Sequence, residues 1–171
     1  MSTKVKQQIS TDQIANRVSE LARQIRSESG DRDVFLLGIL KGTAVFLSDL
    51  LRTVPGDVSY GFIDVVRDMS DTETATALEI DFLSHTGLAG RNVYLIKDVV
   101  SSGVIENYLL TQLRAHKPSS IKLVALLDRP GLRTVDITPD HKGFEVGDGM
   151  FVGYGLEQDG RWGNLPWIGK L

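Results

Sequence analysis

Two stretches of the sequence place small and charged residues where an apolar run gives way to a helix pattern. The apolar residues 93–96 begin a run that ends in the carboxylate of Asp98 and is followed by Ser101-Ser102-Gly103. Residues 34–40 lead in the same way into Lys41-Gly42-Thr43. The backbone N–H groups and the dipole at a helix start bind anions, so each stretch is a candidate phosphate site. Each also fits an ordinary structural reading, in which a serine caps the helix, a glycine eases the turn and a lysine faces water.

The elements around these stretches predict an α/β fold. Residues 34–40 are short and apolar on both faces, which is typical of an interior strand in a parallel sheet. Residues 93–98 and 121–127 predict two further buried strands. A helix is expected from Ser10, because Gln13 lies at the spacing of a capping box. Alternating strands and helices predict a single domain over residues 1–171, with a mainly parallel, twisted sheet flanked by helices. In such sheets ligands bind at the carboxyl edge, where both candidate sites lie.

Outside these core strands the patterns are weaker. Residues 58–66 and 78–82 predict two further strands, and the polar, aperiodic residues 67–76 between them predict a mobile loop. From Gly143 onward the glycine-rich tail predicts short strands and turns.

Composition narrows the classes of function. A net charge of -3 argues against nucleic acid as the main partner. The chain has no cysteine, which excludes disulfides, thiolate catalysis and cysteine zinc sites, and its three scattered histidines offer little for a metal. The polar N-terminus and the lack of a long apolar window predict a cytoplasmic protein with no membrane partner.

Four stretches, in this order along the chain, resemble the hypoxanthine-guanine phosphoribosyltransferase family: residues 37–42, 93–103, 126–130, and 151–156 with 161–171. The resemblance covers nearly the whole length. It implies a type I phosphoribosyltransferase fold with a small C-terminal hood, and a homodimer or homotetramer. It also implies a reaction in which a phosphoribosyl group passes from its magnesium-bound pyrophosphate to a purine nitrogen.

Several positions match the family's binding residues. By resemblance, Leu40-Lys41-Gly42 would hold the pyrophosphate, and in the family the peptide bond here can be cis. Arg129 stands where a lysine donates to the purine's six-position oxygen, and its wider fork would need a reshaped pocket. Met150 and Phe151 occupy the segment that flanks and stacks on the base, although Phe151 could equally be core.

The family's phosphoribosyl-pyrophosphate signature is altered at its acidic positions. Lys97 stands where a glutamate joins Asp98 in gripping the ribose diol. Ser101 replaces the aspartate that manages the proton on the purine's imidazole nitrogen, and losing a general acid or base costs roughly 10²–10⁴ in rate. The catalytic candidates are thus Asp98 and Ser101. The 5′-phosphate site would consist of Ser101, Ser102, Gly103, Val104 and Ile105, with Ile105 in place of a threonine.

Further departures lie outside the signature. Residues 67–76 lack the Ser-Tyr pair that the family's mobile loop uses to exclude water. Gly163 falls where an arginine reaches the pyrophosphate. Glu157 replaces an aspartate near the metal, so the resemblance implies that Glu157 and Asp98 would hold magnesium.

Three hypotheses follow. The favoured one is a pseudoenzyme that binds a purine base, a purine nucleotide or phosphoribosyl pyrophosphate, with impaired or absent transfer and no cofactor. The second is an active purine-salvage enzyme with altered catalytic residues, which would use Mg²⁺. The third is a structural or regulatory partner of a competent paralogue.

Overall fold

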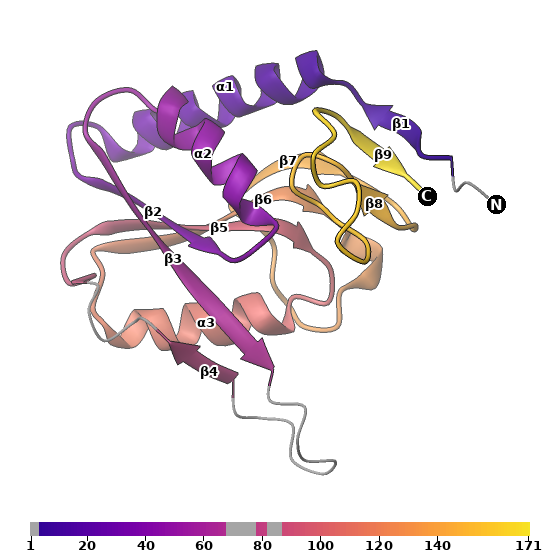
Figure 1. The fold of residues 1–171 in the computed structure, drawn as a ribbon. Coiled ribbons are helices and arrows are strands. Elements are labelled where there is room, and N and C mark those ends of the chain that lie inside the picture. The colour runs from indigo at the N-terminus through magenta and orange to yellow at the C-terminus, as the bar shows by residue number, and fades with distance from the viewer. Residues whose placement is uncertain (1–3, 68–77, 82–86) are drawn as a thin grey trace, which may run out of the picture.

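A six-stranded sheet forms the centre of the computed structural model, which describes residues 4–67, 78–81 and 87–171 (Figure 1). Five neighbouring strands are parallel, and β4 pairs antiparallel to β3 at one edge. The mainly parallel sheet predicted from the apolar runs is therefore confirmed. In spatial order the strands are β4 (Leu78–Asp81), β3 (Val58–Arg67), β2 (Val34–Ile39), β5 (Asn92–Val100), β6 (Ser120–Asp128) and β7 (His141–Glu145).

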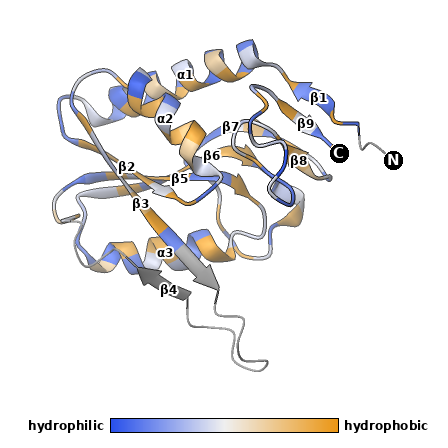
Figure 2. Ribbon diagram, viewed as in Figure 1, coloured by the Kyte–Doolittle hydropathy of each residue, from blue (hydrophilic) through white to orange (hydrophobic). Residues whose placement is uncertain are grey.

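Helices cover both faces of this sheet. Helices α1 (Thr11–Ser29) and α2 (Thr43–Thr53) pack on one face, and α3 (Val104–Ala115) packs on the other (Figure 1). Alternate residues of β2 enter the two cores, with Leu36 on the α1 and α2 side and Leu37 on the α3 side. This two-sided burial explains why the strand is apolar throughout. Figure 2 shows hydrophobic and hydrophilic residues alternating along α1 and α3, as expected for helices with one buried face.

The start of α1 follows the sequence prediction closely. The Gln13 N–H donates to Ser10 Oγ at 3.2 Å, and the Ser10 N–H donates to Gln13 Oε1 at 2.8 Å. This is the reciprocal capping box that the spacing predicts. Ile9 and Ile14, on either side of the cap, are both buried in the core.

A second, three-stranded antiparallel sheet joins the two ends of the chain in the order β1 (Lys6–Ile9), β9 (Ile168–Lys170) and β8 (Phe151–Val152). The glycine-rich sequence of the tail predicts short strands there, which is confirmed, whereas no local pattern predicts β1. Only Ile9 of β1 is buried, so the strand lacks the alternating pattern that would reveal it. Its register, with Lys6 opposite Lys170, depends on a partner far away in the sequence.

The predicted mobile loop at residues 67–76 lies, apart from Arg67, outside the described residues, as does Phe82 at the end of the predicted strand. Within the described part of the chain, no helix has the length and apolar character needed to cross a bilayer.

Candidate functional site

The two candidate anion sites lie side by side at the carboxyl edge of the sheet. Strands β2 and β5 are parallel neighbours, and Gly38 lies opposite Ile96. The loop after β2 and the end of β5 are therefore carried to the same place. A Cβ atom added to Gly42 would overlap the carboxylate of Asp98, so backbone and side chain are in close contact there.

The loop after β2 is enclosed on two sides. Its Leu40–Lys41 peptide bond is cis, in agreement with what the family resemblance implies. Opposite Asp98, the Gly42 carbonyl oxygen would lie 2.5 Å from a Cβ added to Gly155, so only glycine fits at residue 155. Lys41 Nζ lies 2.5 Å from Glu157 Oε1, with the lysine side chain 75% exposed. This ion pair links the loop to the tail.

A second lysine–carboxylate pair lies at the end of β5. Lys97 Nζ is 2.6 Å from Asp98 Oδ1, and the two side chains are only 18% and 16% exposed. The same Oδ1 also accepts the Val99 N–H at 2.8 Å. The one acidic residue that remains of the signature pair is therefore already bound by its neighbour.

The predicted phosphate cradle lies at the start of α3. Gly103 is buried and left-handed, with φ at 81°, and a Cβ atom there would overlap the side chain of Ile137. Ser101, Ser102 and Ile105 are half-buried, whereas Val104 is exposed. The Val104 N–H donates a long 3.4 Å hydrogen bond to Ser102 Oγ. The left-handed backbone explains why residue 103 is a glycine at this turn. It is compatible with anion binding at the start of α3 but does not require it.

Arg133, which no sequence motif points to, contacts the backbone of the predicted phosphate cradle. Its Nη1 donates to the Ser101 carbonyl at 2.6 Å, and its Nη2 is hydrogen-bonded to the buried carboxylate of Asp128. Lys142 Nζ lies 3.6 Å from the other oxygen of Asp128. An aspartate at the end of a buried strand needs a cationic partner, and that requirement is the signal that could have pointed to Arg133.

Glu106, in the first turn of α3, is a second charged residue that was missed. It is only 3% exposed, and burial raises the pKa of its carboxyl group. The Lys97 ammonium opposes this shift, whereas the Asp98 carboxylate adds to it. A carboxylate thus lies buried within the electrostatic reach of both.

The residues expected around the purine are only partly brought together. The Arg129 N–H donates to the Val100 carbonyl at 2.9 Å, which fixes the residue at the site edge. Arg129 Nη2 lies 3.9 Å from Asp148 Oδ1, and its buried Nε has no hydrogen-bond partner among the described residues. Phe151 lines a cavity of about 570 Å³ beside Phe144, whereas neither Arg129 nor Met150 is among the lining residues.

The donor set does not fit a resident magnesium ion. Asp98 and Glu157 are the two carboxylates implied for it, and each is bonded to a lysine. The described residues contain no group of three or more histidine or acidic side chains arranged to hold a metal. Hard divalent cations prefer several oxygen ligands, and here an ammonium group is bonded to one oxygen of each carboxylate.

Comparison with known proteins agrees with this architecture. Residues 8–159 match the family model described as a phosphoribosyl transferase domain. The chain is 37% identical over 163 residues to a hypoxanthine-guanine phosphoribosyltransferase of Bacillus subtilis (strain 168), covering 95% of this chain and 91% of the relative. It is 31% identical over 169 residues to the enzyme of the same name from Mycobacterium avium, covering 95% and 83%.

Solved structures show the same fold. A hypoxanthine-guanine phosphoribosyltransferase from Bacillus anthracis superimposes with a TM-score of 0.86 at 33% identity, covering 98% of both chains. A hypoxanthine phosphoribosyltransferase from Staphylococcus aureus gives a TM-score of 0.90 at 30% identity, covering 97% of this chain and 90% of the other.

Proposed function

This chain belongs to the hypoxanthine-guanine phosphoribosyltransferase family, and on that premise we propose that it binds phosphoribosyl pyrophosphate or a purine nucleotide while transferring the phosphoribosyl group slowly or not at all. One observation carries the proposal. The Lys97 ammonium lies 2.6 Å from Asp98 Oδ1, at the place where the family grips the ribose with two carboxylates. Of the two carboxylates that would accept hydrogen bonds from the ribose diol, only that of Asp98 remains at these two positions, and it is already bonded to Lys97.

The electrostatic consequence concerns the transition state. The family's transition state resembles an oxocarbenium ion, so positive charge develops on the ribose. At about 5 Å and an effective dielectric near 20, two unit charges interact by roughly 3 kcal/mol. Exchanging an anion for a cation at residue 97 removes a stabilising interaction and adds a repulsive one. Both changes raise the barrier for transfer more than they affect binding of an anionic ligand.

Besides stabilisation of the transition-state charge, proton transfer to or from the purine should also be impaired. A carboxylate beside the purine would accept or return the proton of the imidazole nitrogen, and Ser101 stands in that position. A serine hydroxyl has no accessible ionised form near neutral pH, so it cannot act as that base. Ser101 would retain a hydroxyl that can bond to a phosphate or a base, which is compatible with binding.

Several retained features support binding itself. Lys41 and the Gly42 backbone would meet the pyrophosphate, and the start of α3 would meet the 5′-phosphate through Ser101, Ser102, Gly103, Val104 and Ile105. Arg129 and Phe151, with Met150 beside them, would receive the purine. We further propose that residues 1–171 form one such domain, which assembles as a homodimer or homotetramer.

A second candidate is an active purine-salvage enzyme with altered catalytic residues. The 37% identity to the Bacillus subtilis enzyme, over 95% of this chain, supports it. That enzyme form would need Mg²⁺ delivered on the pyrophosphate, because Asp98 and Glu157 are engaged with lysines. Steady-state turnover with hypoxanthine or guanine separates this candidate from the first.

The binding half of the proposal is tested by isothermal titration with guanosine and inosine monophosphate. We expect both nucleotides to bind and Phe151→Ala to weaken them, because the ring would stack on the base. Tyr60→Phe, a change at an exposed aromatic of β3, should leave the affinity unchanged. If neither nucleotide nor phosphoribosyl pyrophosphate binds, the proposal fails and the structural-partner hypothesis takes its place.

A further inference from the structure

Two lysine–carboxylate pairs flank the same glycine. Asp98, bonded to Lys97, lies against one side of Gly42, and Lys41, which precedes Gly42, is bonded to Glu157. Both pairs therefore lie at the loop where a diphosphate would be held. This cluster of Lys41, Lys97, Asp98 and Glu157 is called here the double ion pair.

The double ion pair leaves little room for a divalent cation. Asp98 Oδ1 accepts two hydrogen bonds, from Lys97 Nζ and the Val99 N–H, and its other oxygen lies against the Gly42 backbone. Glu157 Oε1 lies 2.5 Å from Lys41 Nζ. A metal ion at either carboxylate would have to displace an ammonium group and then remain close to it, which like-charge repulsion disfavours.

The lysines can supply the charge that a divalent cation would otherwise bring. An ammonium group has three N–H donors, so Lys97 keeps donors free after bonding to Asp98. Its side chain is 82% covered and held by an acceptor on the adjacent residue, so little rotamer entropy is left to lose when an anion binds.

We infer that Lys97, with Lys41 as the more exposed second contact, takes the place of the divalent cation, so that this chain binds the diphosphate of phosphoribosyl pyrophosphate without any metal. This inference rests on the proposed function, since it specifies how that same ligand is held. Lys97 then becomes a binding residue in its own right. Replacement of the divalent cation by Lys97 would explain both the reversed charge at residue 97 and the lack of a free carboxylate pair.

The test is isothermal titration of the full chain with phosphoribosyl pyrophosphate, once with excess EDTA and once with millimolar magnesium. We expect Kd values that agree within about threefold between the two conditions. Binding that appears only with magnesium overturns the inference but leaves the proposed function intact. Absence of binding in both conditions also overturns the inference, and it defeats the proposed function itself if guanosine and inosine monophosphate do not bind either.

Variants at residue 97 sharpen the result. Lys97→Glu should weaken binding in EDTA by about tenfold or more, because an anion then faces the diphosphate, and magnesium should recover most of that loss. Lys6→Glu makes the same charge change on exposed β1 and should match the parent chain in both conditions. If Lys97→Glu binds in EDTA as tightly as the parent, the inference is wrong.

Lys97→Met keeps the length of the side chain without its charge and decides the matter if Lys97→Glu does not fold. Its affinity in EDTA should fall by about tenfold, whereas an unchanged affinity would overturn the inference. Circular dichroism on each variant establishes that folded protein is being compared.

Discussion

Gly42 and Asp98 are in such close contact that a Cβ atom on residue 42 would overlap the aspartate carboxylate. One belongs to the loop after β2 and the other to the end of β5, so the two candidate anion sites are adjacent. A substitution of either residue should therefore alter the geometry of both candidate anion sites. The position of the Lys97–Asp98 pair depends on residue 42 having no side chain.

Gly42→Ala tests this dependence. We expect the added methyl group to push Asp98 away from the loop, weaken phosphoribosyl pyrophosphate binding by at least tenfold and cost about 1–3 kcal/mol of stability through overpacking. Titration calorimetry and urea unfolding measure the two effects. Gly87→Ala is the matched control, because a Cβ there meets no atom within 4 Å. Equal affinity for Gly42→Ala and the parent chain would refute the contact.

Arg133→Met should be strongly destabilising. It removes the guanidinium that bonds to the buried Asp128 carboxylate, and the cationic partner that remains among the described residues is Lys142 Nζ, 3.6 Å away. Breaking a buried ion pair from one side costs roughly 3–5 kcal/mol, measurable by urea unfolding. The double variant Arg133→Met with Asp128→Asn should regain much of this loss. A small effect from the single variant would mean that Asp128 finds another partner.

Tyr154→Phe tests the connection between the tail and α2. The Tyr154 hydroxyl donates to Asp49 Oδ2 at 2.5 Å, and burial, reinforced by the Asp49 carboxylate, raises the pKa of the Tyr154 hydroxyl. Loss of a hydrogen bond to a charged acceptor should lower stability by about 1.5–3 kcal/mol at neutral pH. A raised pKa contributes stability below the ordinary value near 10 and loses it above, so the difference between the proteins should shrink in strong alkali.

Tyr60→Phe serves as the control for that experiment, because Tyr60 is exposed. Its melting temperature should match that of the parent chain. If Tyr154→Phe behaves in the same way, the hydrogen bond does not hold the tail in place.

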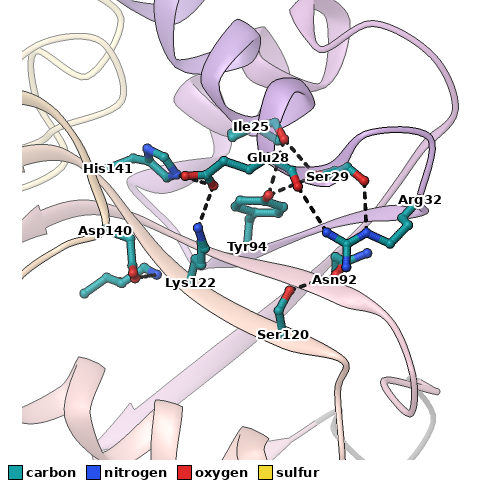
Figure 3. A network of polar contacts seen from close by, with 11 residues as sticks. Ile25, Glu28, Ser29, Arg32, Asn92, Tyr94, Ser120, Lys122, Asp140 and His141 are labelled. Atoms are coloured by element: carbon teal, nitrogen blue, oxygen red, sulfur yellow. Dashed lines mark hydrogen bonds and ion pairs between the residues drawn. The ribbon is translucent and has the colours of Figure 1, made fainter.

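A polar network at the opposite edge of the sheet predicts sensitivity to acid. Glu28 Oε2 lies 2.7 Å from Lys122 Nζ and 3.0 Å from His141 Nε2, joining α1 to β6 and β7 (Figure 3). Burial by itself raises the pKa of Glu28, but the hydrogen bonds from Lys122 and His141 outweigh it, and the pKa is lowered. A lowered pKa contributes stability above the ordinary glutamate value and loses it as the pH falls through the folded value.

Glu28→Gln should therefore melt at a lower temperature than the parent chain at pH 7, and the two curves should converge below about pH 4. Thermal unfolding followed by circular dichroism from pH 3 to pH 8 measures this. A difference that stays constant across that range would show that the carboxylate charge is not what matters. Asp31→Asn, at an exposed position beyond α1, is the control with the same change of charge.

Much of the fold follows from local pattern. The capping box at Ser10 and the fully apolar β2 each express a rule that acts over a few residues, and both predictions are confirmed. Strand β1 was missed because its pairing with β9 is antiparallel across the whole length of the chain and buries only Ile9. Local periodicity carries no information about such a distant partner.

In the candidate site, too, local sequence predicts some features and not others. The residues named from motifs, such as Lys41 and Asp98, do lie together, because parallel neighbouring strands bring their carboxyl ends to one edge. The partners of those residues were not predicted, since an ion pair such as Lys41 with Glu157 depends on side-chain geometry. Glu106 could have been found, because it precedes Leu109 and Leu113 at helical spacing on the buried face of α3.

The initial rate of nucleoside monophosphate formation tests the central claim most directly, with phosphoribosyl pyrophosphate, magnesium and hypoxanthine or guanine as reactants. We predict turnover below about 10⁻² s⁻¹, which is roughly 10²-fold under the lower end of the range of about 1–10³ s⁻¹ typical of enzymes. We also predict a gain of activity in the double variant Lys97→Glu with Ser101→Asp. Turnover by the parent chain within that ordinary range would contradict the account.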